Sequence, residues 1–223
     1  MTPIRRPAAV FGLLLLTSAC AADPPLVLQA SAPPSATGAE VQVSAVGDSI
    51  TEADSDDFDG GDIGPGSWAN YAQGDGVRVI GGWAHAGATT DDMLAGVLAD
   101  VTSGAIHQGP AVLVLMGGSN DIDAGVPIPT ILHNLSEIPK AVGAERVTLS
   151  AVPPEAPVQD TVDALNAQLP ELAAREGWQF TDPLVDVRAP DGSWLPGMSD
   201  DGVHPTQGAA ELIGRRLGAA VRS

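Results

Sequence analysis

Short apolar runs that alternate with longer helical patterns constrain the fold of this chain more than any other feature. Residues 41–46 alternate β-branched residues with polar or small ones and stop at a glycine, which is typical of a strand. Residues 110–116 are apolar throughout, as expected of a central parallel strand that is covered on both faces. Further short runs at 77–80, 146–152 and 178–181 predict three more strands.

Helical patterns occupy the segments between these strands. Periodic apolar residues and helix caps predict helices at residues 67–72, 91–101, 129–142, 158–172 and 205–221. Thr89 and Thr90 are good N-terminal caps for the second of them. The apolar face of that helix is made of Met93, Leu94, Val97, Leu98 and Val101. Pro170 should kink or divide the fourth helix, because an interior proline removes a hydrogen bond and clashes with the preceding turn.

The order of these elements predicts the fold class. Strands that alternate with helices imply a three-layer α/β/α sandwich around a mostly parallel sheet of about five strands. The chain has 223 residues, and nothing after residue 40 has the composition of a linker. We therefore predict a single domain over residues 40–223.

The N-terminal residues resemble a targeting segment rather than part of this domain. Arg5 and Arg6 precede the apolar residues 8–16 and the small residues 17–19, which is the order found in a secretory signal peptide. The apolar run is far shorter than the roughly 20 residues that a membrane-spanning helix needs. The pattern predicts a signal peptide at residues 1–19 and export of the protein.

Cys20, the only cysteine, directly follows the small residues. This arrangement resembles the lipobox of bacterial lipoproteins, in which the cysteine is lipidated and becomes the mature N-terminus. The resemblance implies a lipid anchor on Cys20 at the outer face of the bacterial cell membrane; ordinary cleavage that leaves a free thiol is the alternative. Residues 20–39 are rich in Ala, Ser and Pro and predict a semi-extended tether.

The acidic balance of the chain restricts its partners. Asp and Glu number 28 against 10 Lys and Arg, which gives a formal net charge of -18 at pH 7. Such a surface repels nucleic acid and anionic lipid headgroups. Nucleic acid is therefore not expected as a specific partner, and contact with a membrane is expected only through the lipid anchor.

An acidic loop is predicted at residues 52–62, directly after the first strand and its turn. The spacing of a calcium loop is not met. Aligning Gly60 with the loop glycine of an EF-hand puts Ser55 at the first ligand position and Gly66 where the bidentate glutamate belongs. A solvated rim is the favoured interpretation, and a role in ion binding or as a lid is left open. If the loop lies beside Ser49, it biases the entrance against anionic substrates.

Ser49 is the candidate nucleophile, because it follows the first strand at the sheet edge where ligands of open α/β sheets bind. A serine hydroxyl needs a base to remove its proton as it attacks, and histidine is well matched to that task. His204 is the preferred base, since Asp201 lies three residues before it and can hold the imidazole across a tight turn. Asp48 and Asp121 are interpreted as residues that organise their loops.

Four short motifs occur in order along the chain, at residues 47–51, 85–89, 117–121 and 201–205. Together they resemble the sequence blocks of the SGNH (GDSL-type) hydrolases, and the resemblance covers residues 40–222. It implies a flavodoxin-like three-layer fold and a catalytic triad of Ser49, His204 and Asp201. It also implies an oxyanion hole with three donors, namely the backbone N–H groups of Ser49 and Gly87 and the side-chain amide of Asn120. No metal or organic cofactor is implied.

Other polar and aromatic residues have competing interpretations. His85 is the rival base, although no carboxylate precedes it at a comparable spacing. It lies in residues 83–86, where many members of the family have an asparagine that this chain lacks. His107 and His133 are expected to be structural or solvated. Trp194 either walls the acyl or alcohol pocket or packs over the core.

These observations predict an exported serine esterase that cleaves short-chain carboxylic esters through an acyl-Ser49 intermediate. The expected substrate is an acyl ester on a small molecule or a glycan, because the chain has few aromatic residues and no large apolar insertion. The alternative is a non-catalytic surface lipoprotein that uses the same fold to bind a glycan or a lipid. A monomer is expected, and the natural substrate is left open.

Overall fold

The computed structural model describes residues 40–105 and 109–223. The predicted signal peptide at 1–19, the tether at 20–39 with Cys20, and His107 lie outside the described residues.

Five strands form a parallel sheet in the described part of the chain: β1 Val41–Gly47, β2 Val77–Ala84, β3 Val112–Leu115, β4 Val147–Ser150 and β5 Gln179–Thr181. They lie in the order β2-β1-β3-β4-β5, and every neighbouring pair is parallel. The carboxyl ends of all five strands therefore meet at one edge of the sheet. The predicted parallel sheet is confirmed.

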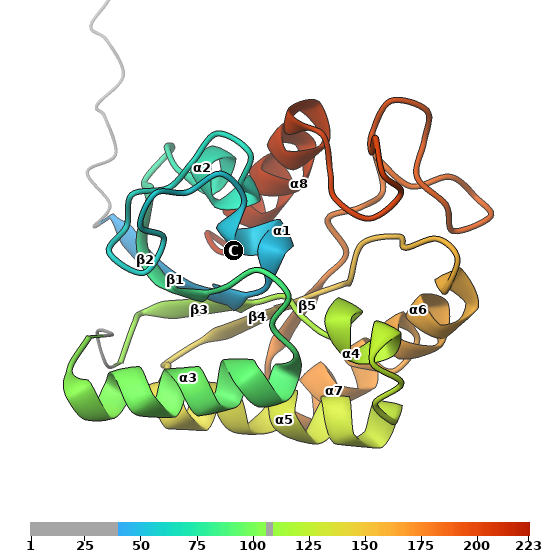
Figure 1. Cartoon of the computed structure of the whole chain (residues 1–223). Coiled ribbons are helices and arrows are strands. Elements are labelled where there is room, and N and C mark those ends of the chain that lie inside the picture. Colours follow the sequence, from blue (N-terminus) through green and yellow to red (C-terminus); the bar gives the residue numbers. More distant parts are fainter. Residues whose placement is uncertain (1–39, 106–108) are drawn as a thin grey trace, which may run out of the picture. The chain divides into compact units, whose positions relative to one another are not determined.

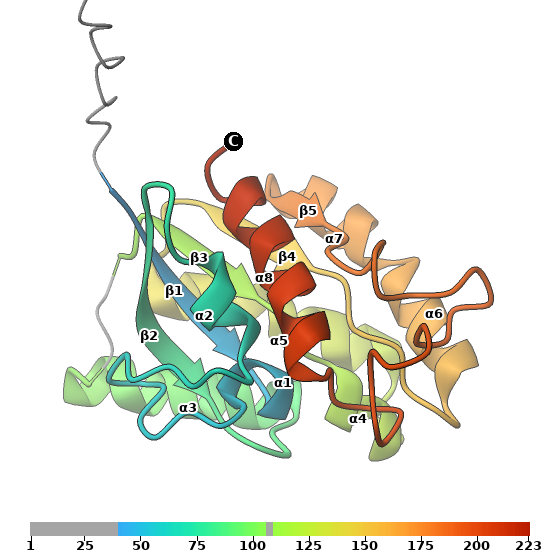
Figure 2. The same cartoon turned by 90° about the horizontal axis from the view of Figure 1, so that it is seen from above.

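Helices cover both faces of this sheet. Four lie on one face, α3 Thr90–Ser103, α5 Ile128–Val142, α6 Gln159–Asn166 and α7 Leu169–Glu176, and two on the other, α2 Trp68–Ala72 and α8 Gln207–Ala220. Figure 1 shows α3 and α5 below the sheet and α2 and α8 above it, and Figure 2 looks down onto α8. The predicted three-layer sandwich is thus confirmed. None of the helices in the described ranges combines the length and apolar composition that crossing a membrane requires.

The core has one half on each face of the sheet, because successive side chains of a strand point to opposite faces. In β3, Val112 and Val114 pack with α2 and α8. Leu113 and Leu115 point the other way and pack with α3 and α5. All four side chains are fully buried. The apolar run that predicted a doubly covered strand is therefore explained by burial on both sides.

The structure contains two short helices that the sequence patterns did not predict, α1 Ser49–Glu52 and α4 Ser119–Asp123. Each is about one turn long, and a single turn has no apolar periodicity to detect. The division at Pro170 is confirmed, because this residue lies in the first turn of α7, where a missing N–H costs no helical hydrogen bond.

Leu98, which belongs to the apolar face expected for this helix, is not buried in the core. Leu98 is 48% exposed, whereas Met93 and Val97 of the same helix are fully buried. The packing partners of α3 are β2, which is the edge strand, and α5. A helix at the edge of the sheet buries only part of its apolar face, and Leu98 lies outside the buried part.

The substitution Gly214→Ala in α8 is expected to lower the free energy of unfolding by about 1–3 kcal/mol, the usual cost of overpacking a core. A Cβ at Gly214 would lie 2.2 Å from the backbone oxygen of Trp68 and 2.8 Å from Tyr71 Cβ. Urea unfolding followed by circular dichroism measures the change. Gly208→Ala is the matched control in the same helix, because a Cβ there would have no neighbour within 4 Å. An equal loss in both variants would contradict close packing of α8 on α2.

Candidate active site

The predicted site residues converge at the carboxyl-terminal edge of the sheet. Ser49 follows β1, Gly87 follows the neighbouring strand β2, and Asn120 follows β3 on the other side of β1. The long segment after β5 returns to this edge and brings Asp201 and His204 to the start of α8. Figure 2 shows α1, α4 and the first turn of α8 near the same end of the sheet. The parallel sheet thus gathers residues from four separate parts of the chain.

A hydrogen-bonded relay connects Ser49, His204 and Asp201. Ser49 Oγ lies 2.9 Å from His204 Nε2, and His204 Nδ1 lies 2.7 Å from Asp201 Oδ2. With the proton on Nδ1, His204 Nε2 can accept the serine proton, as a general base must. The side chains of His204 and Asp201 are 49% and 55% exposed, so the relay is open to substrate.

Asp201 also fixes the turn that carries the histidine. Its Oδ1 accepts hydrogen bonds from the backbone N–H groups of Val203, at 2.9 Å, and His204, at 2.8 Å. The hydrogen bond from the His204 side chain, followed by that from the Val203 N–H, holds the pKa of the Asp201 carboxyl well below its usual range. Asp201 is therefore ionised whenever the imidazole is able to act as a base.

A tight strand-to-helix turn presents Ser49. Asp48 caps α1, and its Oδ1 accepts a hydrogen bond from the Ile50 N–H at 3.0 Å. Gly47 has no space for a side chain, because a Cβ would lie 2.1 Å from Thr51 Oγ1. This close packing fixes the direction in which the Ser49 hydroxyl leaves the sheet.

Asp48, the capping residue of this turn, is buried with 1% of its surface exposed. Burial raises the pKa of Asp48 to about 6. Hydrogen bonds from the backbone N–H groups of Ile50 and Asp48, together with the nearby His204, lower this pKa but do not outweigh burial. Its contacts are those of a residue that organises the loop, and the carboxyl costs stability whenever it is ionised.

Three candidate oxyanion donors come from adjacent turns. In the described part of the chain, the backbone N–H groups of Ser49 and Gly87 donate to no protein acceptor. Asn120 Nδ2 donates to the carbonyl of Ala88 at 3.0 Å, which places this amide beside the Gly87 turn. An amide carries two hydrogens, so the second can donate to a substrate oxygen. A Cβ at Gly87 would meet nothing within 4 Å, so the space beside it is open.

Asp121 joins the Asn120 turn to the start of α3. Its Oδ1 accepts from Thr90 Oγ1 at 2.6 Å, and its Oδ2 accepts from the Thr90 N–H at 2.7 Å. Asn134 of α5 donates to the same Thr90 hydroxyl at 3.2 Å. Burial raises the pKa of Asp121, and the hydrogen bonds from Thr90 oppose this. The turns that supply Gly87 and Asn120 are therefore locked together through one buried network.

His85, the rival base, has a different partner. Its Nε2 lies 3.2 Å from Asp59 Oδ2, and within the described residues no hydrogen bond joins it to Ser49. Asp59 Oδ1 also accepts from the Ala84 N–H at 3.2 Å. Burial raises the pKa of the Asp59 carboxyl. Sequence reasoning missed this pair because the carboxylate comes from the acidic loop, and no spacing rule connects that loop to His85.

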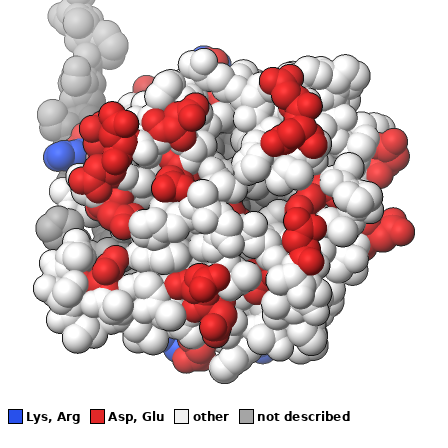
Figure 3. Space-filling view, viewed as in Figure 1, with Lys and Arg blue, Asp and Glu red and all other residues white. Residues whose placement is uncertain are grey.

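The acidic loop at residues 52–62 is packed against the domain. Phe58 is 3% exposed, and backbone hydrogen bonds of 2.8 and 3.4 Å join Asp57 and Asp62. In residues 40–105 and 109–223, no group of three or more His, Cys, Asp or Glu side chains could hold a metal ion. Figure 3 shows acidic residues spread over the face seen in Figure 1, with Lys and Arg only at its margin. The loop is thus an anchored acidic rim.

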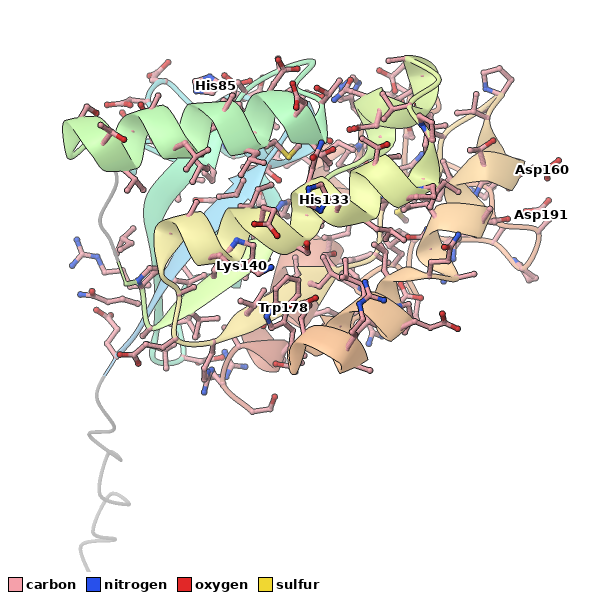
Figure 4. The ribbon with its side chains drawn as sticks, turned by 90° about the horizontal axis from the view of Figure 1, so that it is seen from below. His85, His133, Lys140, Asp160, Trp178 and Asp191 are labelled. Carbon is pink, nitrogen blue, oxygen red and sulfur yellow. The ribbon has the colours of Figure 1, made fainter. Side chains whose placement is uncertain are left out.

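Two further residues lie outside the relay. His133 is exposed on α5, as Figure 4 shows, and agrees with the solvated interpretation. Trp194 packs against the half of the core under α2 and α8. Its Nε1 is buried without a hydrogen-bond partner among the described residues. This environment favours the interpretation of Trp194 as an aromatic that covers the core.

Comparison with known proteins gives one family and several solved structures of the same fold. The sequence matches the model of the GDSL-like lipase/acylhydrolase family over residues 45–212. No curated protein sequence gives a match. A lipolytic protein of the G-D-S-L family from Desulfitobacterium hafniense DCB-2 is similar with a TM-score of 0.66 and 20% identity, covering 81% of this chain and 99% of that one. An acetylxylan esterase from Geobacillus stearothermophilus has a TM-score of 0.63 and 18% identity, covering 82% and 95%.

A Ser-His-Asp relay at the carboxyl ends of the strands of a parallel α/β/α fold is the arrangement of a serine hydrolase. The chain belongs to the GDSL-like lipase/acylhydrolase family and is a serine ester hydrolase. The predicted resemblance to the GDSL-type hydrolases is confirmed.

The substitution Asp48→Asn is expected to flatten the pH dependence of stability. The pKa of Asp48 is about 6 in the fold against an ordinary value of 3.8. The folded state therefore binds this proton more tightly, and wild-type stability falls as the pH rises from about 4 to about 6. At 1.4 kcal/mol per pH unit the loss is up to about 3 kcal/mol. Asn keeps an acceptor for the Ile50 N–H but does not titrate.

Urea unfolding of both proteins at about pH 4 and about pH 7 measures this effect. The variant should gain stability relative to the wild type at the higher pH, because only the wild type carries the buried charge there. A difference between the two proteins that is the same at both pH values would contradict the raised pKa of Asp48.

Proposed function

We propose that the protein is an exported serine esterase that hydrolyses short-chain carboxylic esters through an acyl-Ser49 intermediate. The observation that carries the proposal is the unbroken relay from Ser49 Oγ through His204 to Asp201, with distances of 2.9 and 2.7 Å. Membership of the GDSL-like family supports ester hydrolysis as the reaction.

Acylation begins when Ser49 Oγ attacks the ester carbonyl. His204 Nε2 takes the serine proton, and Asp201 stabilises the imidazolium that forms. Negative charge develops on the carbonyl oxygen, and the N–H groups of Ser49 and Gly87 donate to it together with the amide of Asn120. His204 then gives its proton to the departing alcohol, which leaves the acyl group on Ser49.

Deacylation repeats these steps with water as the nucleophile. His204 removes a proton from water as its oxygen attacks the acyl carbon, and the same donors stabilise the oxyanion. The proton passes back from His204 to Ser49 Oγ as the acyl–oxygen bond breaks. The products are a carboxylic acid and the free enzyme.

A short acyl group on a larger carrier suits the surroundings of Ser49. A long acyl chain needs an apolar surface to cover it. In residues 40–105 and 109–223, the exposed large hydrophobic residues are Leu98 on α3 and Val185, and neither belongs to the turns that form the relay. The half-exposed side chain of His204 leaves room for a bulky alcohol. The similarity of the fold to that of an acetylxylan esterase supports an acetyl ester of a glycan as the class of substrate.

Export and anchoring are proposed from the N-terminal residues. The signal-peptide pattern at 1–19 and the lipobox-like position of Cys20 support a lipoprotein at the outer face of the bacterial cell membrane. The tether at 20–39 would hold the domain away from the bilayer. The acidic domain would itself be repelled by anionic headgroups, so the anchor would provide the membrane contact.

Kinetics on p-nitrophenyl esters of increasing chain length test the mechanism and the acyl preference. The full-length protein should release p-nitrophenol fastest from the acetyl ester. Ser49→Ala should lower kcat/KM by about a thousandfold or more, because it removes the nucleophile. Ser193→Ala is a matched control, since Ser193 is exposed and bonds locally to Asp191, and it should retain wild-type activity.

Two outcomes of this experiment would contradict the proposal. A wild-type protein that is no faster than Ser49→Ala on every ester would remove the acyl-Ser49 mechanism and favour the binding-protein alternative. Faster cleavage of long-chain esters than of acetyl or butyryl esters would overturn the short-chain assignment.

The substitution Cys20→Ala tests the lipid anchor in a bacterial host. The wild-type chain should be found with the membrane fraction and should incorporate a labelled fatty acid. Cys20→Ala should lose the label and leave the membrane fraction, because the apolar run at residues 8–16 is too short to span the bilayer in place of the lipid. A wild-type chain that takes up no label would contradict lipidation.

A further inference from the structure

The segment that follows β4 completes the row of turns at the site. Ser49, Gly87 and Asn120 follow β1, β2 and β3, and Glu155 lies in the segment after β4, the next strand of the sheet. Glu155 is 3% exposed. A carboxyl group is rarely buried to this extent without a specific partner. The proposed mechanism gives Glu155 no chemical step, so its burial calls for another explanation.

Residues 151–156 form a firmly held segment. Pro153 and Pro154 restrict the φ angles at its centre. The backbone N–H of Ala151 donates to the Thr181 carbonyl at 3.0 Å, and that of Val152 donates to Asn166 Oδ1 at 2.8 Å. The N–H of Glu155 donates to Gln159 Oε1 at 3.1 Å, and that of Ala156 donates to the Gly202 carbonyl at 3.2 Å. The segment is thus fixed at every N–H that it possesses.

The side chain of Glu155 holds the turn that carries Asn120. Ser119 Oγ donates a hydrogen bond to Glu155 Oε2, and Ser119 is itself 5% exposed. Ser119 is the first residue of α4, and the N-cap residue, Gly118, has no side chain with which to cap this helix. The bond to Glu155 therefore anchors this end of α4, one residue before Asn120.

The residue after Glu155 ties the same segment to the turn of the triad. The Ala156 N–H donates to the carbonyl of Gly202, which lies between Asp201 and His204 in the chain. Gly202 has a φ of +84°, a conformation that favours glycine. Two adjacent residues thus contact both the turn of the oxyanion donor and the turn of the base.

We propose that Glu155 is a positioning residue of this esterase. Its carboxyl group holds the Ser119 turn so that the Asn120 amide is aimed at the oxyanion, while Ala156 fixes that turn relative to His204. This role deepens the proposed function and rests on it.

The charges near Glu155 support this placement. Burial raises the pKa of Glu155, and the hydrogen bond from Ser119 opposes this; nearby Asp123 raises the pKa further, and His204 lowers it. Glu155 in turn raises the pKa of Asp48, below the nucleophile. The carboxyl group therefore lies within electrostatic reach of both the nucleophile turn and the base.

Steady-state kinetics of the full-length protein on p-nitrophenyl acetate test this role. Glu155→Ala should lower kcat by about 10-fold or more with KM within about twofold of wild type, because a displaced oxyanion donor weakens the transition state rather than substrate binding. Glu155→Gln keeps an oxygen acceptor for Ser119 Oγ and should restore kcat to within about threefold. Glu137→Ala removes a partly exposed carboxylate of α5 that pairs with Lys140 and should match the wild type.

A double-mutant cycle shows whether Glu155 acts through Ser119. Ser119→Ala should lower kcat as Glu155→Ala does, and the double variant should lose little more than either single one, because both changes break the same contact. Additive losses, no loss of kcat in Glu155→Ala, or no recovery in Glu155→Gln would overturn the proposal.

Amide hydrogen exchange gives a readout that does not depend on turnover. In Glu155→Ala, peptides covering 118–124 and 199–206 should exchange faster than in the wild type, and those covering residues 94–103 of α3 should be unchanged. Unchanged exchange in both segments would overturn the role of Glu155. A wild-type protein that hydrolyses no ester would overturn the proposed function alone, since exchange still decides on Glu155. If Glu155→Ala does not fold, Ser119→Ala supplies the same measurement at 118–124.

Discussion

The hydrogen bond between Ser49 Oγ and His204 Nε2 is the interaction on which the site depends, and it joins residues that are 155 positions apart. Local preferences cannot bring these side chains together; the parallel sheet does so. β1 ends at the nucleophile, and β5 lies at the far end of the strand order. The segment after β5 must therefore return past the turns that follow β4 and β3, and Ala156 contacts Gly202 on this return. The geometry of the relay depends on how firmly those turns are held.

Buried carboxyl groups hold these turns. Asp48 caps α1, Asp121 binds Thr90, and Glu155 accepts from Ser119. Burial raises the pKa of all three carboxyl groups. An ionised carboxylate in such a place costs stability, yet it accepts directional hydrogen bonds that an apolar side chain cannot accept. The two apolar halves of the core offset this cost. The domain therefore tolerates destabilising buried carboxyl groups where they fix the positions of the reacting groups.

Patterns that act over a few residues made much of the fold predictable. The strands follow from burial on both faces of the sheet, and the division at Pro170 follows from the geometry of proline. The pairing of Asp201 with His204 could be predicted because a three-residue spacing brings both into one turn. Glu155 could not be predicted, because its partner Ser119 lies 36 residues away and no spacing rule connects the turns after β3 and β4. The short helices α1 and α4 could not be predicted either, because a single turn shows no apolar periodicity.

The negative charge of the domain affects how substrate approaches and how product leaves in the proposed reaction. Hydrolysis converts an uncharged ester into a carboxylate at neutral pH, and the acidic loop at 52–62 begins three residues after Ser49. The face shown in Figure 3 carries acidic groups with Lys and Arg only at its margin. Screened repulsion extends over about 8–10 Å at physiological salt. It acts on the anionic product leaving Ser49 and not on a neutral ester approaching it. The net negative charge of the chain therefore favours departure of an anionic product over its return and disfavours esters carried on anionic molecules.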